Sequence, residues 1–118
     1  MRPSGLALIA TLVLPAPLFG HAVLTKASLD TASVRANTAT TVTLSFNAAI
    51  ESGFTKVVLV DARNEEHVLE VLPQGEPGKV SVTVPPLAPG TYGLRYKVLA
   101  ADGHVTESVL RFTVAAAD

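Results

Sequence analysis

The chain has 118 residues, of which 48% are hydrophobic, and its formal net charge is −1 at pH 7. This length suits one domain, and the near-neutral charge, without a basic stripe, argues against nucleic acid as a partner. There is no cysteine, which excludes disulfides, thiolate metal sites and a cysteine nucleophile. Stability therefore has to come from the packing of an apolar core.

Residues 1–20 are predicted to be a signal peptide, so we expect an exported, periplasmic protein. Arg2 supplies the charged start, and an apolar run from Leu6 to Leu14 is followed by two prolines and the small residue Gly20. This apolar run is shorter than the roughly 20 residues that a bilayer-spanning helix needs.

The cleavage point decides whether His21 survives in the mature protein. Cleavage after Gly20 makes His21 the first residue of a mature domain at 21–118. The small residues Gly20 and Ala22 also allow cleavage after Ala22, which would remove His21. We prefer the first position because of the metal chemistry described below.

The mature part predicts seven short strands separated by turn signals, with no amphipathic helix. The cleanest alternation is in 40–46, where Val42, Leu44 and Phe46 share one face. Residues 32–37 are expected to form a polar turn. The pattern indicates an all-β fold, a seven-stranded antiparallel immunoglobulin-like Greek-key sandwich or barrel. The expected strands cover residues 22–29, 40–46, 56–61, 67–72, 79–84, 91–99 and 107–114.

The sequence Pro89-Gly90-Thr91-Tyr92 is typical of a tyrosine corner, in which a tyrosine near the start of the sixth strand bonds back to the preceding connection. We therefore expect Tyr92 to have a structural role.

Strand parity brings two distant segments together. If each strand runs opposite to the one before, the start of the first strand and the loop 100–106 after the sixth lie at the same end. This would place His21 beside Asp102 and His104. The same count places His67 at the other end, where we assign it no role.

These three residues offer a donor set that suits copper(II). A terminal His21 supplies an α-amine and an imidazole, His104 a second imidazole, and Asp102 a carboxylate oxygen. Tetragonal sets of nitrogen and oxygen donors favour copper(II), and its binding competes with protons, so affinity falls with acidification. The competing interpretation of Asp102-Gly103-His104 is an ordinary turn.

The other carboxylates form no comparable group in the sequence. Asp61 is interpreted as a lone carboxylate, and Glu65 and Glu66 as part of a solvated turn.

Several motifs together resemble the CopC family of periplasmic copper-resistance proteins. The resemblance implies a seven-stranded Greek-key β-fold and a non-enzymatic copper(II) carrier that binds the ion through His21, Asp102 and His104. It also implies a membrane copper transporter of the CopD type as a partner, and we expect a monomer. The motifs are His21-Ala-Val-Leu, Leu44-Ser-Phe46, Leu87-Ala-Pro-Gly-Thr-Tyr92, Asp102-Gly-His104 and Val109-Leu-Arg-Phe-Thr-Val114.

The chain departs from this family at three places. Many members have a methionine-rich copper(I) site, whereas Met1 is the only methionine here, so the chain resembles the copper(II)-only members. Asn47 stands where members often have a glutamate near the copper. Val105 stands where a proline often follows the motif histidine.

Two other functions remain open from the sequence. The first is a small copper monooxygenase acting on polysaccharides, which would also use a terminal histidine but needs longer loops and an aromatic surface. The second is an exported immunoglobulin-like module without metal, which predicts no change on replacing His21. Oxidised oligosaccharides formed with ascorbate would favour the enzyme.

Overall fold

The computed structural model describes residues 22–30 and 32–116. The predicted signal peptide at 1–20 and the candidate ligand His21 lie outside the described residues. Within the described part there is no α-helix, and neither short helical turn has the length and apolar character needed to cross a membrane.

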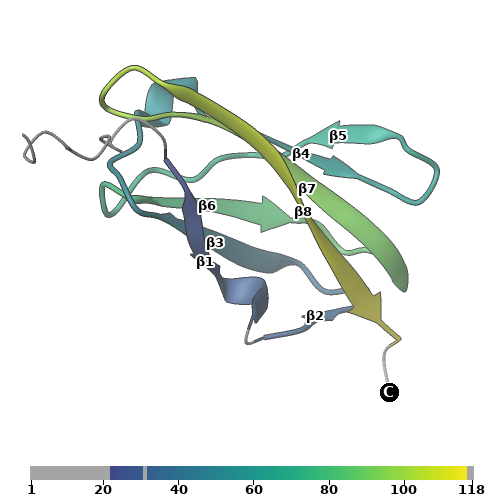
Figure 1. Cartoon of the computed structure of the whole chain (residues 1–118). Coiled ribbons are helices and arrows are strands. Elements are labelled where there is room, and N and C mark those ends of the chain that lie inside the picture. The colour runs from purple at the N-terminus through teal and green to yellow at the C-terminus, as the bar shows by residue number, and fades with distance from the viewer. Residues whose placement is uncertain (1–21, 31, 117–118) are drawn as a thin grey trace, which may run out of the picture.

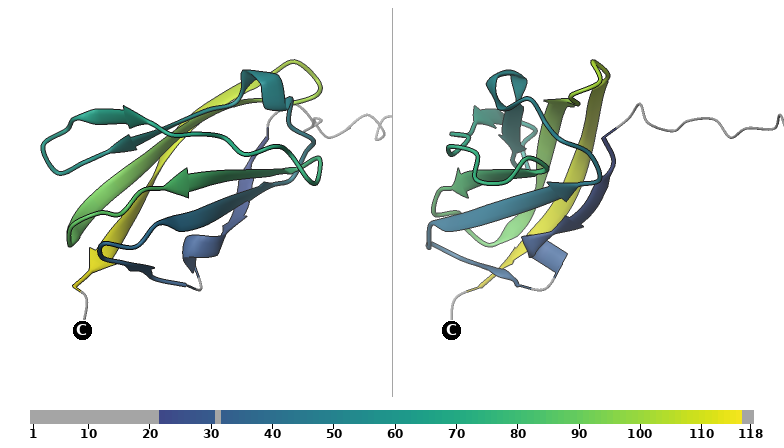
Figure 2. Two further views of the ribbon diagram at one scale, coloured as in Figure 1. Left: turned by 180° about the vertical axis from the view of Figure 1, so that it is seen from behind. Right: turned by 90° about the vertical axis from the view of Figure 1, so that its left-hand side faces the viewer.

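Two β-sheets pack face to face, which confirms the predicted all-β sandwich (Figures 1 and 2). The three-stranded sheet has the order β1 (Leu24–Ala27), β3 (Thr40–Phe46), β6 (Lys79–Val84). The five-stranded sheet has the order β2 (Val34–Arg35), β8 (Val105–Ala115), β7 (Gly90–Leu99), β4 (Lys56–Val60), β5 (Glu66–Val68). Two 3-10 turns, η1 (Ser28–Asp30) and η2 (Ser52–Phe54), complete the described elements.

The core lies between the sheets and follows the alternation seen in the sequence. Val42 and Leu44 of β3 are fully buried, as is Leu94 on the facing β7. Phe46 and Tyr96 meet edge to face, with ring centroids 5.5 Å apart. No polar or charged side chain of the described residues is buried. Burial of each large apolar side chain contributes about 1.5–3 kcal/mol to the free energy of folding. The apolar side chains on the facing surfaces of the two sheets therefore hold the sheets together.

The first two predicted elements differ from the structure. The strand expected at 22–29 ends at Ala27, because the carboxylate of Asp30 accepts the Ala27 N–H at 2.9 Å and begins a helical turn. The polar turn expected at 32–37 contains the short strand β2, which pairs in parallel with β8. The Val34 side chain is buried in the core, and this burial favours the pairing of the segment with β8.

The strand predicted at 67–72 is divided between the two sheets. β5 ends at Val68, and the N–H of Leu69 still bonds to Val57 of β4. The N–H of Leu72 instead donates to Ser81 of β6, in the other sheet. The chain therefore crosses from one layer to the other within this segment.

The hairpin of β7 and β8 is the longest pairing and carries the candidate site at its tip. Ten residue pairs run from Gly90–Val114 to Leu99–Val105. At the opposite end of β7, the Tyr92 hydroxyl donates to the carbonyl oxygen of Ala88 at 2.7 Å. The predicted tyrosine corner is confirmed, and it fixes the connection that leads into this hairpin.

Candidate metal centre

The tip of the hairpin is a tight turn from Ala100 to His104. The N–H of Ala100 donates to the His104 carbonyl at 2.8 Å, and the N–H of Gly103 donates to the Ala100 carbonyl at 2.9 Å. Gly103 has a φ of +96°, a left-handed conformation that L-residues with a Cβ adopt at a cost. The glycine therefore allows the bend between the two candidate ligands.

Asp102 and His104 converge at this turn. The Asp102 carboxylate oxygen Oδ1 accepts the backbone N–H of His104 at 3.1 Å, and the same oxygen lies 3.2 Å from His104 Nδ1. Both side chains reach solvent, with 36% and 57% of their surface exposed. The pair therefore presents one anionic oxygen and one imidazole to an ion arriving from outside.

The turn is held against the segment that follows β3. Ala101 donates its N–H to the Ala49 carbonyl at 3.0 Å, and Ile50 bridges to Ala100. One residue further, the N–H of Glu51 donates to the carbonyl of Leu99 at 2.8 Å. These contacts fix the base of the turn on a neighbouring loop.

The start of the described chain is fixed to the same loop. Asn47 exchanges two hydrogen bonds with Val23, one through its side chain at 2.8 Å and one through its backbone N–H at 3.0 Å. Ala22, which directly follows His21, is 1% exposed. Figure 1 shows the start of β1 and the tip of the β7–β8 hairpin at the same end of the sandwich. The described residues thus have the arrangement that strand parity predicts, up to the residue after His21.

His67 lies on β5, away from this turn. It is opposite Leu59 of β4, and Leu59 is opposite Leu94 in the middle of β7. Figures 1 and 2 place the β4–β5 turn and the β7–β8 turn at opposite ends of the molecule. The predicted separation of His67 from His104 is confirmed.

The interpretation of Asp61 as a lone carboxylate is wrong. Ligand atoms of Asp61, Glu65 and His67 lie within 4.8 Å of one another around the β4–β5 turn. In the sequence these three residues are separated by four and then two positions. This spacing predicts a cluster only if the turn between Asp61 and Glu65 is known to be tight. This group is separate from Asp102 and His104.

Comparison with known proteins identifies one family and one curated relative. A sequence model described as the CopC domain matches residues 24–115. The protein YobA of Escherichia coli strain K12 is 30% identical over 115 residues, covering 92% of this chain and 90% of YobA.

Solved structures share the fold of this chain. The CopC protein of Methylosinus trichosporium OB3b superposes with a TM-score of 0.71 at 27% identity, covering 83% of this chain and 97% of that protein. The copper resistance protein PcoC of Escherichia coli is 21% identical with a TM-score of 0.60, covering 78% and 98%, and supports the fold alone.

Proposed function

This chain belongs to the CopC family, and from that premise we propose that it is an exported copper(II)-binding protein of copper trafficking, homeostasis or resistance. The single observation that carries the proposal is the convergence of Asp102 and His104 at one exposed turn, where Asp102 Oδ1 lies 3.2 Å from His104 Nδ1. The M. trichosporium protein with the higher TM-score is named CopC, and PcoC is named a copper resistance protein.

We assign the copper ligands to His21, Asp102 and His104. Val23 is hydrogen-bonded to Asn47, and Ala101 is hydrogen-bonded to Ala49. The loop 47–49 therefore contacts both the segment that follows His21 and the turn that carries Asp102 and His104, which supports this assignment. The set provides nitrogen and carboxylate oxygen donors, which suit copper(II) in a tetragonal geometry. The only methionine is Met1, so the mature chain would have no thioether with which to favour copper(I).

Export would complete this site. Removal of residues 1–20 would free the α-amine of His21, so that one residue supplies two nitrogen donors. We place the protein in the periplasm, where it would pass copper(II) to a membrane transporter of the CopD type. We expect no catalysis, because Asp102 would take a position that an oxygen-activating copper site leaves open.

The test is a copper(II) titration of protein whose amino terminus is verified as His21, followed by electron paramagnetic resonance. We expect one tight site with nitrogen-rich tetragonal signals. Replacing His104 with alanine, or adding one residue before His21, should weaken the site by more than about tenfold, since even outer partners of metal ligands contribute that much.

His67→Gln is the matched control, because it removes an imidazole at the other end of the sandwich. Its tight-site spectrum should equal that of the unmodified protein. Equal tight binding by the His104→Ala protein would refute the assignment. Oxidised oligosaccharides formed from chitin or cellulose with ascorbate would instead favour a monooxygenase.

A further inference from the structure

The outer face of the five-stranded sheet follows from the register of its strands. Leu94, Tyr96 and Val98 of β7 belong to the core, so Arg95 and Lys97 between them point away from it. Residues directly opposite one another in a ladder share a face of the sheet. The outer face therefore also includes the partners of Arg95 and Lys97 on the two neighbouring strands, which are Lys56, Val58, Glu107 and Val109.

Two further groups extend this face. Glu66, Val60, Gly93 and Arg111 lie opposite one another on successive strands from β5 to β8. Arg35 of β2 joins them, because the residues on either side of it are buried in the core. The outer face thus extends across all five strands of the sheet.

This face is cationic, although the whole chain has a formal net charge of −1. Five basic and two acidic side chains give it a net charge of +3. The basic residues are Arg35, Lys56, Arg95, Lys97 and Arg111, and the acidic residues are Glu66 and Glu107. Both carboxylates pair with Arg95, whose Nη2 lies 3.0 Å from Glu66 Oε1 and whose Nε lies 3.9 Å from Glu107 Oε2.

Two lysines on this face lack such a partner. No carboxylate of the described residues lies within 4.0 Å of the ammonium groups of Lys56 and Lys97. The two residues are directly opposite one another on β4 and β7. Like charges in opposite positions destabilise a strand pair, so an anionic surface brought to this face would relieve the repulsion.

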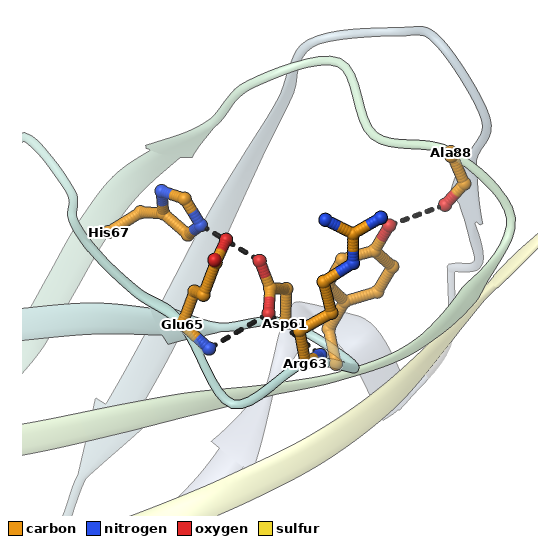
Figure 3. Close-up of polar contacts among 6 residues, drawn as sticks. Asp61, Arg63, Glu65, His67 and Ala88 are labelled. Atoms are coloured by element: carbon orange, nitrogen blue, oxygen red, sulfur yellow. Dashed lines mark hydrogen bonds and ion pairs between the residues drawn. The ribbon is translucent and has the colours of Figure 1, made fainter.

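A hollow of about 510 Å³ lies in this face. Gly93 lines it, and the missing side chain leaves room, since a Cβ there would lie 3.1 Å from Val109 Cγ1. Arg95 and Arg111 also line it, and a guanidinium binds phosphate oxygens through parallel N–H donors. Asp61 borders the hollow, but its carboxylate accepts hydrogen bonds within the β4–β5 turn (Figure 3). The hollow therefore offers two arginines to a phosphate group.

We propose that the outer face of the five-stranded sheet docks on a lipid bilayer through the phosphate headgroups of anionic lipids. Charge complementarity supports this occupant, because each Lys or Arg near an anionic membrane surface contributes about 1 kcal/mol to binding. Val68, Val105 and Val109 on the same face are each more than half exposed, and an apolar surface beside basic residues can enter the headgroup region. The basic side chains are spread over four strands, which favours a broad surface over a single acidic segment of a protein.

Docking by this face would bring the hairpin tip to the membrane. Val105 directly follows His104 and lies at the tip end of the face, opposite Leu99. Asp102 and His104 would then lie at the margin of the contact. The inference does not rest on copper binding, because none of the five basic residues is a proposed copper ligand.

The test is co-sedimentation of the metal-free mature protein with vesicles of equal parts phosphatidylglycerol and phosphatidylcholine, compared with vesicles of phosphatidylcholine alone. We expect weak, reversible binding to the anionic vesicles, little binding to the neutral ones, and a loss of binding with added salt, because exposed charges are screened. Lys97→Gln and Arg111→Gln should each weaken binding about fivefold, which corresponds to about 1 kcal/mol for each basic residue.

Lys26→Gln is the matched control, because it removes an exposed lysine from β1 of the other sheet. Its binding should equal that of the unmodified protein, and a thermal melt verifies that each variant is folded. Spin-labelled lipid in the anionic vesicles provides a readout without any substitution. It should broaden the NMR signals of Val109 and spare those of Thr41, which precedes buried Val42 and lies on the outer face of the three-stranded sheet.

The absence of binding to the anionic vesicles, equal losses in Lys26→Gln and Lys97→Gln, or broadening at Thr41 would overturn the proposal. Polyglutamate that binds where the vesicles do not would assign the face to an acidic protein instead. Inorganic phosphate that shifts the Arg111 signals where the vesicles do not bind would assign the hollow to a free anion. A copper(II) titration of the same protein is a separate measurement, so failure of one proposal is distinguishable from failure of the other.

Discussion

Asn47 binds both backbone polar groups of Val23. Its Oδ1 accepts the Val23 N–H at 2.8 Å, and its own N–H donates to the Val23 carbonyl at 3.0 Å. Two residues later in the same loop, Ala49 accepts the N–H of Ala101 at 3.0 Å. The loop after β3 therefore connects the start of the described chain to the turn that presents Asp102 and His104.

Replacing Asn47 with alanine should loosen this connection. The backbone bond to Val23 remains but the side-chain acceptor is lost, and one neutral hydrogen bond contributes about 1 kcal/mol. If His21 is a ligand, copper(II) affinity should fall about fivefold, which corresponds to the same 1 kcal/mol. Amide hydrogen exchange at Val23 should become faster in the metal-free protein.

Asn47→Asp is the control, because it keeps an oxygen acceptor at the same position and should keep the Val23 amide protected. Faster exchange at Val23 in Asn47→Ala without any change in copper affinity would show that this contact does not position a ligand. Exchange is measured without metal, so this readout stands even if copper binding fails.

Gly103→Ala should destabilise the hairpin tip through the backbone alone. A Cβ at this position would meet nothing within 4 Å, but the φ of +96° lies in a region that costs L-residues about 1–2 kcal/mol. We expect the free energy of unfolding, measured in urea, to fall by that amount. Gly53→Ala is the control, since it also meets nothing within 4 Å and has no positive φ, and its stability should be nearly unchanged. Equal effects of the two variants would contradict the explanation.

The strands that were predicted well are those whose pattern is local. β3, β6 and β7 alternate cleanly because one face of each packs into the core, and this period can be counted in the sequence. β2 was not predicted because it is formed by only two residues, Val34 and Arg35, and depends on pairing with β8, about eighty positions away. The crossing between sheets at Leu69 to Leu72 also depends on partners distant in sequence.

The candidate sites show the same division. The convergence of Asp102 and His104 could be predicted, because two side chains at a spacing of two on a turn can point in the same direction. The hydrogen bonds of Asn47 to Val23 could not be, because the side chain contacts a residue 24 positions away. The grouping of Asp61, Glu65 and His67 could not be predicted, because it depends on a tight turn with a positive φ at Asn64, which the sequence does not reveal.

Tyr92→Phe should lower stability while it leaves metal binding unchanged. The substitution removes the 2.7 Å hydrogen bond to Ala88 but keeps the ring that stacks on Phe112 at a centroid distance of 5.8 Å. We expect a loss of about 0.5–1.5 kcal/mol in the free energy of unfolding. Titration of this variant with copper(II) should match the unmodified protein, because Tyr92 lies near the end of β7 that is remote from the hairpin tip. A loss of affinity without a loss of stability would contradict a structural role.

The ion pair between Arg95 and Glu66 should make stability depend on acid pH. Arg95 Nη2 lies 3.0 Å from Glu66 Oε1, and this hydrogen bond, followed by charge attraction, holds the pKa of Glu66 below its ordinary value of 4.5. A lowered native pKa contributes stability above the unfolded value, and this contribution is lost as pH falls through the native value. The unmodified protein should therefore exceed Glu66→Gln in stability near pH 7, by a small amount because the pair is exposed.

Thermal melts of both proteins from pH 7 to pH 2.5 measure this difference. It should be constant down to about pH 5 and then shrink, and added salt should reduce it because exposed charges are screened. In an Arg95→Gln background, the stability difference caused by replacing Glu66 should depend less on pH, because the main partner that lowers the Glu66 pKa is gone and only the weaker attraction of Lys56 remains. A difference that stays constant to pH 2.5 would show that the glutamine acts through packing and that the charge of Glu66 contributes nothing.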